Sequence, residues 1–228
     1  MENYLDLLKG LPLFNGINRN DIPVILKNLK AVTAGFEKGE YIRSEGDAAD
    51  FIGILLEGEI HVLQDDYYGN RNINFSFHAG DMFAEAFACA GASELPVDIL
   101  AMSKVKILFL NCEQIFGECS ESCEYHSILV RNLLKIVAQK NMLLNQKLSY
   151  SSHKTTSEKV MAYLSDQAKM HHSSEFIIPF DRQGLADYLG VDRSALCVEI
   201  SRLQKQGRLI TRRSYFKLLP TEHQRSNA

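Results

Sequence analysis

The spacing of apolar and polar residues changes three times along the 228-residue chain. Residues 1–35 carry apolar positions at helical spacing, and residues 36–112 carry short apolar runs between turns. Residues 113–150 return to helical spacing, and residues 151–228 combine short helical stretches with short strands. These changes predict an N-terminal domain over 1–112, then a long helix, then a C-terminal domain.

Glycines beside acidic residues divide the stretch that follows Phe36. Tight turns are predicted at Gly39-Glu40, Gly46-Asp47, Gly58-Glu59 and Gly80-Asp81. Further strands are expected at 95–101 and 105–110. Short strands joined by tight turns at regular spacing are typical of an all-β barrel or jelly roll.

One apolar stripe of the long helix has the spacing of a coiled coil. Its positions advance by 4, 3, 4, 3 and 4 residues: Val130, Leu134, Val137, Asn141, Leu144 and Leu148. This spacing predicts the interface of a two-stranded homodimer, in which a buried Asn141 fixes the register. A neighbouring stripe is expected to pack on the barrel of the same chain: Leu129, Leu133, Ile136 and Leu143. An ordinary buried helix is the alternative, because only about three heptads are present.

Residues 182–206 have the pattern of two short helices joined by a tight turn. Their inner faces are predicted from Leu185, Ala186 and Leu189, and from Leu196, Ile200 and Leu203. Gly190 lies where the turn needs a positive φ, and Asp192 can cap the second helix. This is the pattern of a helix-turn-helix, whose second helix enters the major groove of DNA. A helical hairpin in another kind of core is the alternative.

The segments on both sides of this motif predict a winged helix. A helix begins at Thr155 with capping-box spacing, and residues 176–180 predict a strand. Two more strands are predicted on either side of the basic tip Arg212-Arg213, which is suited to contact phosphate. The polar run at 150–154 is expected to be a hinge.

Charge is divided unevenly along the chain. Residues 1–150 hold 13 Lys and Arg against 20 Asp and Glu, whereas residues 151–228 hold 12 against 8. The C-terminal domain is therefore the positive part, as contact with DNA phosphates requires. No apolar run is long enough to span a bilayer, and no signal peptide is recognised. A cytoplasmic protein with its five cysteines reduced is expected.

Four glycine-centred motifs follow one another in the predicted barrel: Phe36-x-x-Gly39-Glu40-x-Ile42, Glu45-Gly46-Asp47-x-x-Asp50, Gly58-Glu59-Ile60-x-Val62 and Gly80-Asp81-x-Phe83-x-Glu85. Together they resemble the cyclic nucleotide-binding barrel of the CRP/FNR family of bacterial transcription regulators. The order of barrel, long helix and helix-turn-helix also resembles that family, over nearly the whole chain.

The resemblance implies an α+β protein with three parts. These are an N-terminal double-stranded β-helix (jelly-roll) sensor barrel over 1–112, a dimerisation helix over 113–150 and a C-terminal winged helix-turn-helix over 151–228. It also implies a homodimeric regulator, not an enzyme, that binds palindromic double-stranded DNA and contacts RNA polymerase. A small-molecule effector would then shift its DNA affinity.

By this resemblance, Arg193 at the start of the second helix is the expected base-reading residue. Its guanidinium can bond O6 and N7 of a guanine together. Ser194, Ala195 and Val198 are its expected neighbours on the exposed face. Many relatives carry a second arginine where Val198 stands, so a different half-site is expected. Phosphate contacts are expected from Thr155, Arg182, Gln183, Arg202, Arg212 and Arg213.

An effector pocket is expected at seven positions of the barrel: Gly80, Phe83, Ala84, Glu85, Ala86, Val97 and Asp98. Nucleotide-binding relatives hold the cyclic phosphate with an arginine and a following small hydroxyl residue, where this chain has Val97 and Asp98. An apolar side chain and a carboxylate would leave a phosphate unpaired, so tight binding of cyclic AMP or cyclic GMP is not expected. Arg71 or Lys104 in the pocket would reverse this expectation. The sequence leaves the effector and any cofactor unknown, and a regulator without an effector stays open.

Two alternatives involve other chemistry. Cys119, Cys123 and His126 lie at i, i+4 and i+7 and could hold a metal in a metal or redox sensor, although free cysteines are the simpler interpretation. A cupin-like enzyme is the other alternative. It is disfavoured because His61 and His78 are isolated in the sequence and no catalytic fingerprint is present.

Overall fold

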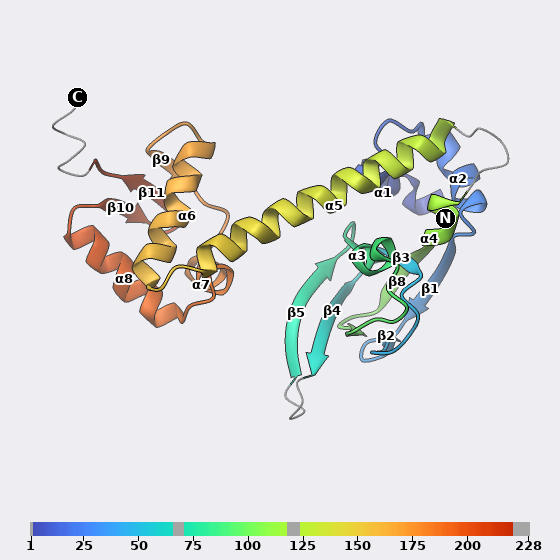
Figure 1. Ribbon diagram of the computed structural model, residues 1–228, viewed down its shortest axis with the longest axis horizontal. Helices are drawn as coiled ribbons and strands as arrows, with labels where there is room; N and C mark the ends of the chain where they lie inside the picture. The colour runs from blue at the N-terminus through green and yellow to red at the C-terminus, as the bar shows by residue number, and fades with distance from the viewer. Residues whose placement is uncertain (1, 66–70, 118–123, 221–228) are drawn as a thin grey trace. The chain divides into compact units, whose positions relative to one another are not determined.

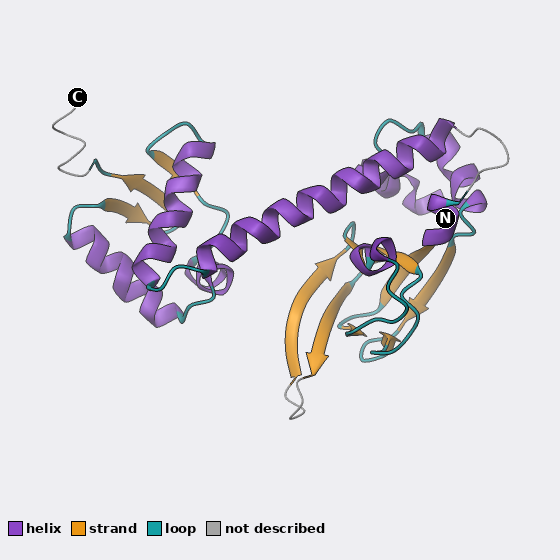
Figure 2. Ribbon diagram, in the orientation of Figure 1, coloured by secondary structure: helices purple, strands orange, loops and turns teal. Residues whose placement is uncertain are grey.

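The computed structural model describes residues 2–65, 71–117 and 124–220. The chain folds into two units, Met1–Gln139 and Lys140–Ala228, which are described separately below. Figure 1 traces the chain from its N-terminus to its C-terminus, and Figure 2 marks the helices and strands.

Two four-stranded sheets, antiparallel throughout, form the barrel of the first unit (Figure 2). One has the order β1 (Val32–Phe36), β8 (Val105–Asn111), β3 (Phe51–Glu57) and β6 (Met82–Phe83). The other has the order β2 (Tyr41–Arg43), β7 (Asp98–Ala101), β4 (Glu59–Asp65) and β5 (Arg71–His78). Apolar side chains of both sheets pack together between them, among them Leu55, Phe83 and Ile99. The predicted barrel of short strands joined by tight turns is confirmed in this stretch, which also contains the short helix Glu85–Ala90.

Two glycines of the barrel are required by close approach. A Cβ on Gly53 would lie 2.1 Å from the ring of Phe83, which packs flat on the strand at this point. Gly58 has φ +88° in the turn between β3 and β4, and a Cβ there would lie 2.5 Å from the Lys104 carbonyl oxygen. The predicted Gly58-Glu59 turn therefore has both a conformational and a steric cause.

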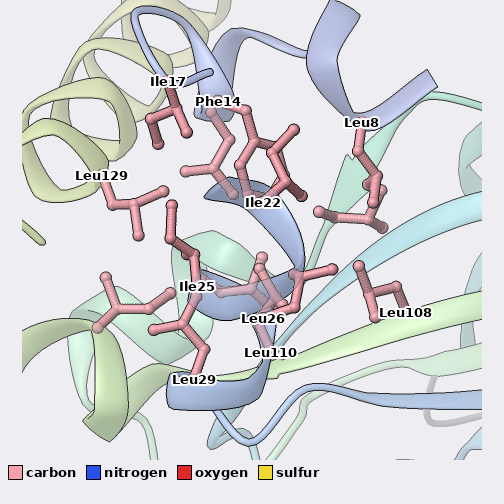
Figure 3. Close-up of a cluster of buried hydrophobic side chains, with 14 of the residues drawn as sticks. Leu8, Phe14, Ile17, Ile22, Ile25, Leu26, Leu29, Leu108, Leu110 and Leu129 are labelled. Carbon is pink, nitrogen blue, oxygen red and sulfur yellow. The ribbon is translucent and has the colours of Figure 1, made fainter. Parts of the chain in front are cut away.

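A second core lies on the outer face of the β1–β8–β3 sheet, where short helices cover it (Figure 3). These are α1 (Leu5–Gly10), α2 (Ile22–Asn28) and the 3-10 turns Glu2–Tyr4, Pro12–Phe14 and Arg19–Asp21. Phe14, Ile22 and Leu108 are wholly buried there, and Leu129 packs against the same cluster from α5. Two more short helices, α3 (Glu85–Ala90) and α4 (Cys112–Phe116), complete the elements before the long helix.

The long helix α5 spans Glu124–Ser151 and continues from the first unit into the second. Its predicted barrel-facing stripe is confirmed at Leu129 and Leu133, which are 2% and 1% exposed. The prediction is wrong for Leu143, which is 61% exposed, because the core of the first unit ends before that turn.

The second unit has a core of its own. Helices α6 (Thr156–Met170), α7 (Arg182–Leu189) and α8 (Arg193–Lys205) pack on a sheet of order β10 (Leu209–Arg212), β11 (Tyr215–Leu218), β9 (Glu175–Ile177). This arrangement confirms the predicted winged helix-turn-helix fold. The hinge predicted at 150–154 begins too early, because Tyr150 is still helical and is buried at 1% exposure.

Within the described residues, every helix is too short or too polar to cross a membrane.

Candidate functional site

The helix-turn-helix is built from local signals that the sequence displays. Asp181 Oδ1 accepts from the Gly184 N–H at 2.7 Å and caps α7, and Asp192 Oδ1 accepts from the Ala195 N–H at 3.0 Å and caps α8. Gly190 ends α7 with φ +61°, as the turn requires. All six predicted inner-face residues are 3% exposed or less: Leu185, Ala186, Leu189, Leu196, Ile200 and Leu203.

The opposite face of α8 is open along its first two turns. Arg193, Ser194 and Ala195 are exposed in the first turn, and Val198 is 69% exposed one turn later. The Ser194 hydroxyl donates to Asp192, so it is oriented by the cap residue. All four predicted base-reading residues are therefore exposed to solvent in the first two turns of α8, and their contacts with bases stay a prediction.

Two of the four predicted phosphate-binding arginines already have partners. Arg202 donates to the Glu199 carboxylate in the same helix from Nε and from Nη2, the latter at 2.8 Å. Arg182 donates to Thr211 Oγ1 at 2.9 Å and lies over the Phe216 ring at 5.0 Å. Partial burial is the main cause that lowers the pKa of Arg182. Both side chains are thus ordered by the protein, and either would have to share or leave its partner to bind phosphate.

The remaining predicted phosphate contacts lie at the ends of elements. Thr155 caps α6 in a complete capping box with Glu158, in which the Thr155 hydroxyl oxygen accepts from the Glu158 N–H at 3.2 Å. Gln183 donates to Asp187 at 2.8 Å. Arg212 and Arg213 are exposed at the tip between β10 and β11, where Arg213 has φ +54°.

Six of the seven predicted effector residues divide into three groups by their position. Phe83, Ala84 and Val97 belong to the apolar core of the barrel, with Phe83 and Val97 at 1% and 6% exposure. Glu85 is 4% exposed at the start of α3, whereas Ala86 beside it is exposed. Gly80 turns the chain with φ +97° and faces Leu7 and Leu11. Their joint role as a pocket stays a prediction.

Two charged side chains near the barrel core, Asp98 and Arg43, have partners within the first unit. Asp98 Oδ1 accepts from the Glu45 N–H at 2.8 Å. Arg43 lies over the rings of Phe51 and Phe109, 5.0 Å from each centroid. Its guanidinium is therefore engaged by aromatic rings at the edge of the barrel core.

The predicted metal ligands Cys119 and Cys123 lie outside the described residues, and His126 is half-buried near the start of α5. In the part of the chain that is described, no group of three His, Cys, Asp or Glu residues is arranged to hold a metal ion. Cys112 and Cys89 lie near each other, and burial, followed by the charge of Cys89, raises the pKa of Cys112 to about 12. A thiol with so high a pKa is a poor metal ligand at neutral pH.

The two histidines that are isolated in the sequence meet in the structure. His61 Nε2 lies 3.1 Å from Glu59 Oε1, and His78 Nε2 lies 3.9 Å from the same oxygen. A hydrogen bond from Ser76, followed by one from His61, lowers the pKa of Glu59. The pairing of β4 with β5 causes this meeting, because it places Glu59 opposite His78 and His61 opposite Ser76.

The predicted dimer stripe on α5 is partly open and partly covered. Leu134, Leu144 and Leu148 are 68%, 54% and 67% exposed, and Asn141 between them is also exposed. Val130 and Val137 pack against the core of the first unit instead. The open part also includes Met142 and Leu143, at 71% and 61% exposure.

An aromatic cluster in the second unit was not foreseen from the sequence. Tyr150 at the end of α5 makes ring contacts with Tyr163 of α6 and Tyr188 of α7, with centroids 5.7 and 6.1 Å apart. The Tyr150 hydroxyl donates to Asp166 at 3.1 Å. The apolar spacing within any one helix does not reveal such a cluster, because each tyrosine comes from a different element.

Comparison with known proteins agrees with the barrel fold of the first unit and the winged helix-turn-helix fold of the second. Residues 34–122 match the family model described as the cyclic nucleotide-binding domain. A search of the curated proteins found no match.

Solved structures resemble the chain over most of its length. The Catabolite Activator Protein of Thermus thermophilus is 16% identical, with TM-score 0.52, covering 91% of this chain and 93% of that one. DNR from Pseudomonas aeruginosa is 18% identical, with TM-score 0.51 and coverage of 99% and 98%. The c-di-GMP responsive global regulator CLP of Xanthomonas campestris is 15% identical, with TM-score 0.52 and coverage of 90% and 100%.

These comparisons define the fold class: a domain that matches the cyclic nucleotide-binding model over residues 34–122, followed by a unit with a winged helix-turn-helix fold. The full chain has the fold of the CRP/FNR regulators, so the resemblance predicted from the glycine motifs is confirmed at the level of fold.

Proposed function

We propose that this chain is a homodimeric, non-enzymatic transcription regulator of the CRP/FNR type that binds palindromic DNA. The observation that carries the proposal is the open face of α8, where Arg193, Ser194, Ala195 and Val198 are exposed over a fully buried inner face. A recognition helix needs this division, because one side must hold the fold while the other reads base edges.

The exposed side chains suit direct readout of a major groove. Arg193 has no ion-pair or hydrogen-bond partner within the described residues, so its guanidinium is available for a guanine. Val198 presents an apolar surface that suits a thymine methyl group. Arg212 and Arg213 at the wing tip would contact flanking phosphates. We further propose a bacterial cytoplasmic location and contact with RNA polymerase, as for a regulator of this type.

Selection from a random duplex pool with the full-length protein tests the proposal. The expected product is an inverted repeat, and Arg193→Ala should weaken its binding by about 10- to 100-fold, since a base-reading arginine is worth about 1–3 kcal/mol. Lys27→Ala, which removes an exposed cation from α2, is the matched control and should bind normally. Fluorescence anisotropy measures both. Failure to enrich any sequence would contradict the proposal.

We also propose that the barrel does not bind cyclic AMP or cyclic GMP tightly. By the family resemblance, Val97 stands where an arginine is expected, and its side chain packs into the barrel core. Asp98 stands where a small hydroxyl residue is expected, and it places a carboxylate there. Neither can stabilise a phosphate anion. Calorimetric titration with each nucleotide should give no saturable heat at micromolar concentrations; a micromolar Kd for either one would contradict the proposal.

A further inference from the structure

A polar cavity of about 410 Å³ opens between the N-terminal segment and the first half of α5. It is lined by Asn15, Gly16, Ser127, Ile128, Arg131, Asn132 and Lys135. All of these residues belong to the first unit, and none was singled out by the predicted DNA-binding surface, effector pocket or dimer stripe. Six of the seven present a polar side chain or an unshielded backbone amide, so the cavity suits a polar ligand.

Two cations of the same helix face line this cavity. Arg131 and Lys135 are four residues apart, one helical turn, and both are exposed. Within the described part of the chain, neither has an ion-pair or hydrogen-bond partner, and no carboxylate lines the cavity.

The floor of the cavity is held in place by a buried amide. Asn132 is 7% exposed, and its Nδ2 donates to the carbonyl oxygens of Leu13 and Asn15 at 2.9 and 2.8 Å. These bonds fix the N-terminal segment against α5, close to where Ile17 and Leu129 enter the apolar core (Figure 3). Gly16 then turns the chain with φ +83°, and its N–H has no acceptor among the described residues.

We propose that this cavity binds the phosphate group of a small phosphorylated metabolite. The two cations match the charge of a phosphate monoester, which is about −1.5 to −2 at neutral pH. The guanidinium of Arg131 can bond two phosphate oxygens at once, while Lys135 supplies a point charge. The Gly16 N–H, the Ser127 hydroxyl and the Asn15 amide provide further donors for the remaining oxygens.

The size of the cavity favours a small molecule over a macromolecule. Its volume lies within the range of about 300–1,000 Å³ that is usual for small-ligand sites. Lys135 itself lies beside the proposed dimer stripe, because successive residues of a helix are displaced by about 100° and Lys135 follows Leu134 directly. Binding here does not depend on whether the chain binds DNA.

Calorimetric titration of the full-length protein with inorganic phosphate and with glycerol 3-phosphate, at constant ionic strength, tests the proposal. Saturable binding is expected for both, and Arg131→Gln or Lys135→Gln should each weaken it by about tenfold, the usual loss for one charge-assisted hydrogen-bond partner. Lys38→Gln removes an exposed cation from the β1–β2 turn and should leave the affinity unchanged. The Gly16 amide resonance should shift on titration in the native protein and in Lys38→Gln.

Three outcomes would overturn the proposal: no saturable heat with either probe, unchanged affinity in both cavity variants, or tighter binding of succinate than of both phosphate probes. The last result would identify a dicarboxylate site. DNA binding by the same preparation is measured independently, so a failure of the cavity proposal and a failure of the proposed function are distinguishable.

Discussion

Ala84 adopts a backbone conformation that alanine normally avoids. Its φ of +62° and ψ of −3° lie in the left-handed region, immediately before α3. Glycine, unlike alanine, reaches this region without strain. The side chain of Ala84 packs against the barrel core, so the chain accepts local strain in exchange for an apolar contact.

We expect Ala84→Gly to raise the free energy of unfolding by about 0.5–1 kcal/mol, because it removes a left-handed alanine. The same change at Ala138, an exposed position inside α5, should lower it by about 1 kcal/mol, since glycine weakens a regular helix. Equilibrium urea denaturation measures both variants. A loss of stability in Ala84→Gly as large as that in Ala138→Gly would show that the buried methyl group outweighs the strain.

At the scale of elements, α5 carries several of the large apolar side chains that are exposed among the described residues. Leu134, Leu144 and Leu148 form an apolar stripe that is exposed. Asn141 lies between them, and its Oδ1 accepts a hydrogen bond from Asn145 Nδ2 at 2.7 Å. A helix that exposes several leucines along one face is unusual for a monomer. The same stripe of a second copy would cover these leucines. The coiled-coil spacing therefore favours a homodimer, as in the proposed function.

Leu144→Asp should raise the dissociation constant of this dimer by about 100-fold or more, because each protomer would bury an unpaired carboxylate. Gln139→Asp is the control, since it adds the same charge to an exposed position on the opposite side of the helix. Sedimentation equilibrium should find a dimer for the native chain and for Gln139→Asp. A monomeric native protein would instead contradict the dimer.

At the scale of the whole molecule, the net charge differs between the N-terminal and C-terminal parts of the chain. The stretch 1–150 has an excess of acidic residues, and 151–228 has an excess of basic ones. A protein that touches DNA only through its C-terminal unit needs this division, because acidic surface repels the phosphate backbone.

The affinity for the selected duplex should therefore fall steeply as salt concentration rises. Arg212→Gln should reduce the slope of log K against log [salt] by about 1 for each phosphate contact that is lost, and weaken all sequences alike. Arg193→Ala should instead weaken the selected sequence most. Anisotropy titrations over a range of potassium chloride concentrations separate the two effects, and an identical slope in Arg212→Gln would exclude the wing tip from the DNA contact.

The sequence by itself determined the features whose causes are local. The positive φ at Gly58, the caps at Asp192 and Thr155, and the inner face of the helix-turn-helix all follow from residues within a few positions of one another. Such features are set by backbone conformation and by helical or strand periodicity, which a single stretch of chain displays.

Only the tertiary structure decided the features that join distant segments. It placed Arg182 against Thr211 and Phe216, and it brought His61 and His78 to Glu59. It also set Arg131 and Lys135 beside Asn15. These partners depend on strand register and on which helix face meets which sheet, and both are fixed by burial of apolar surface over the whole unit, which no local pattern records.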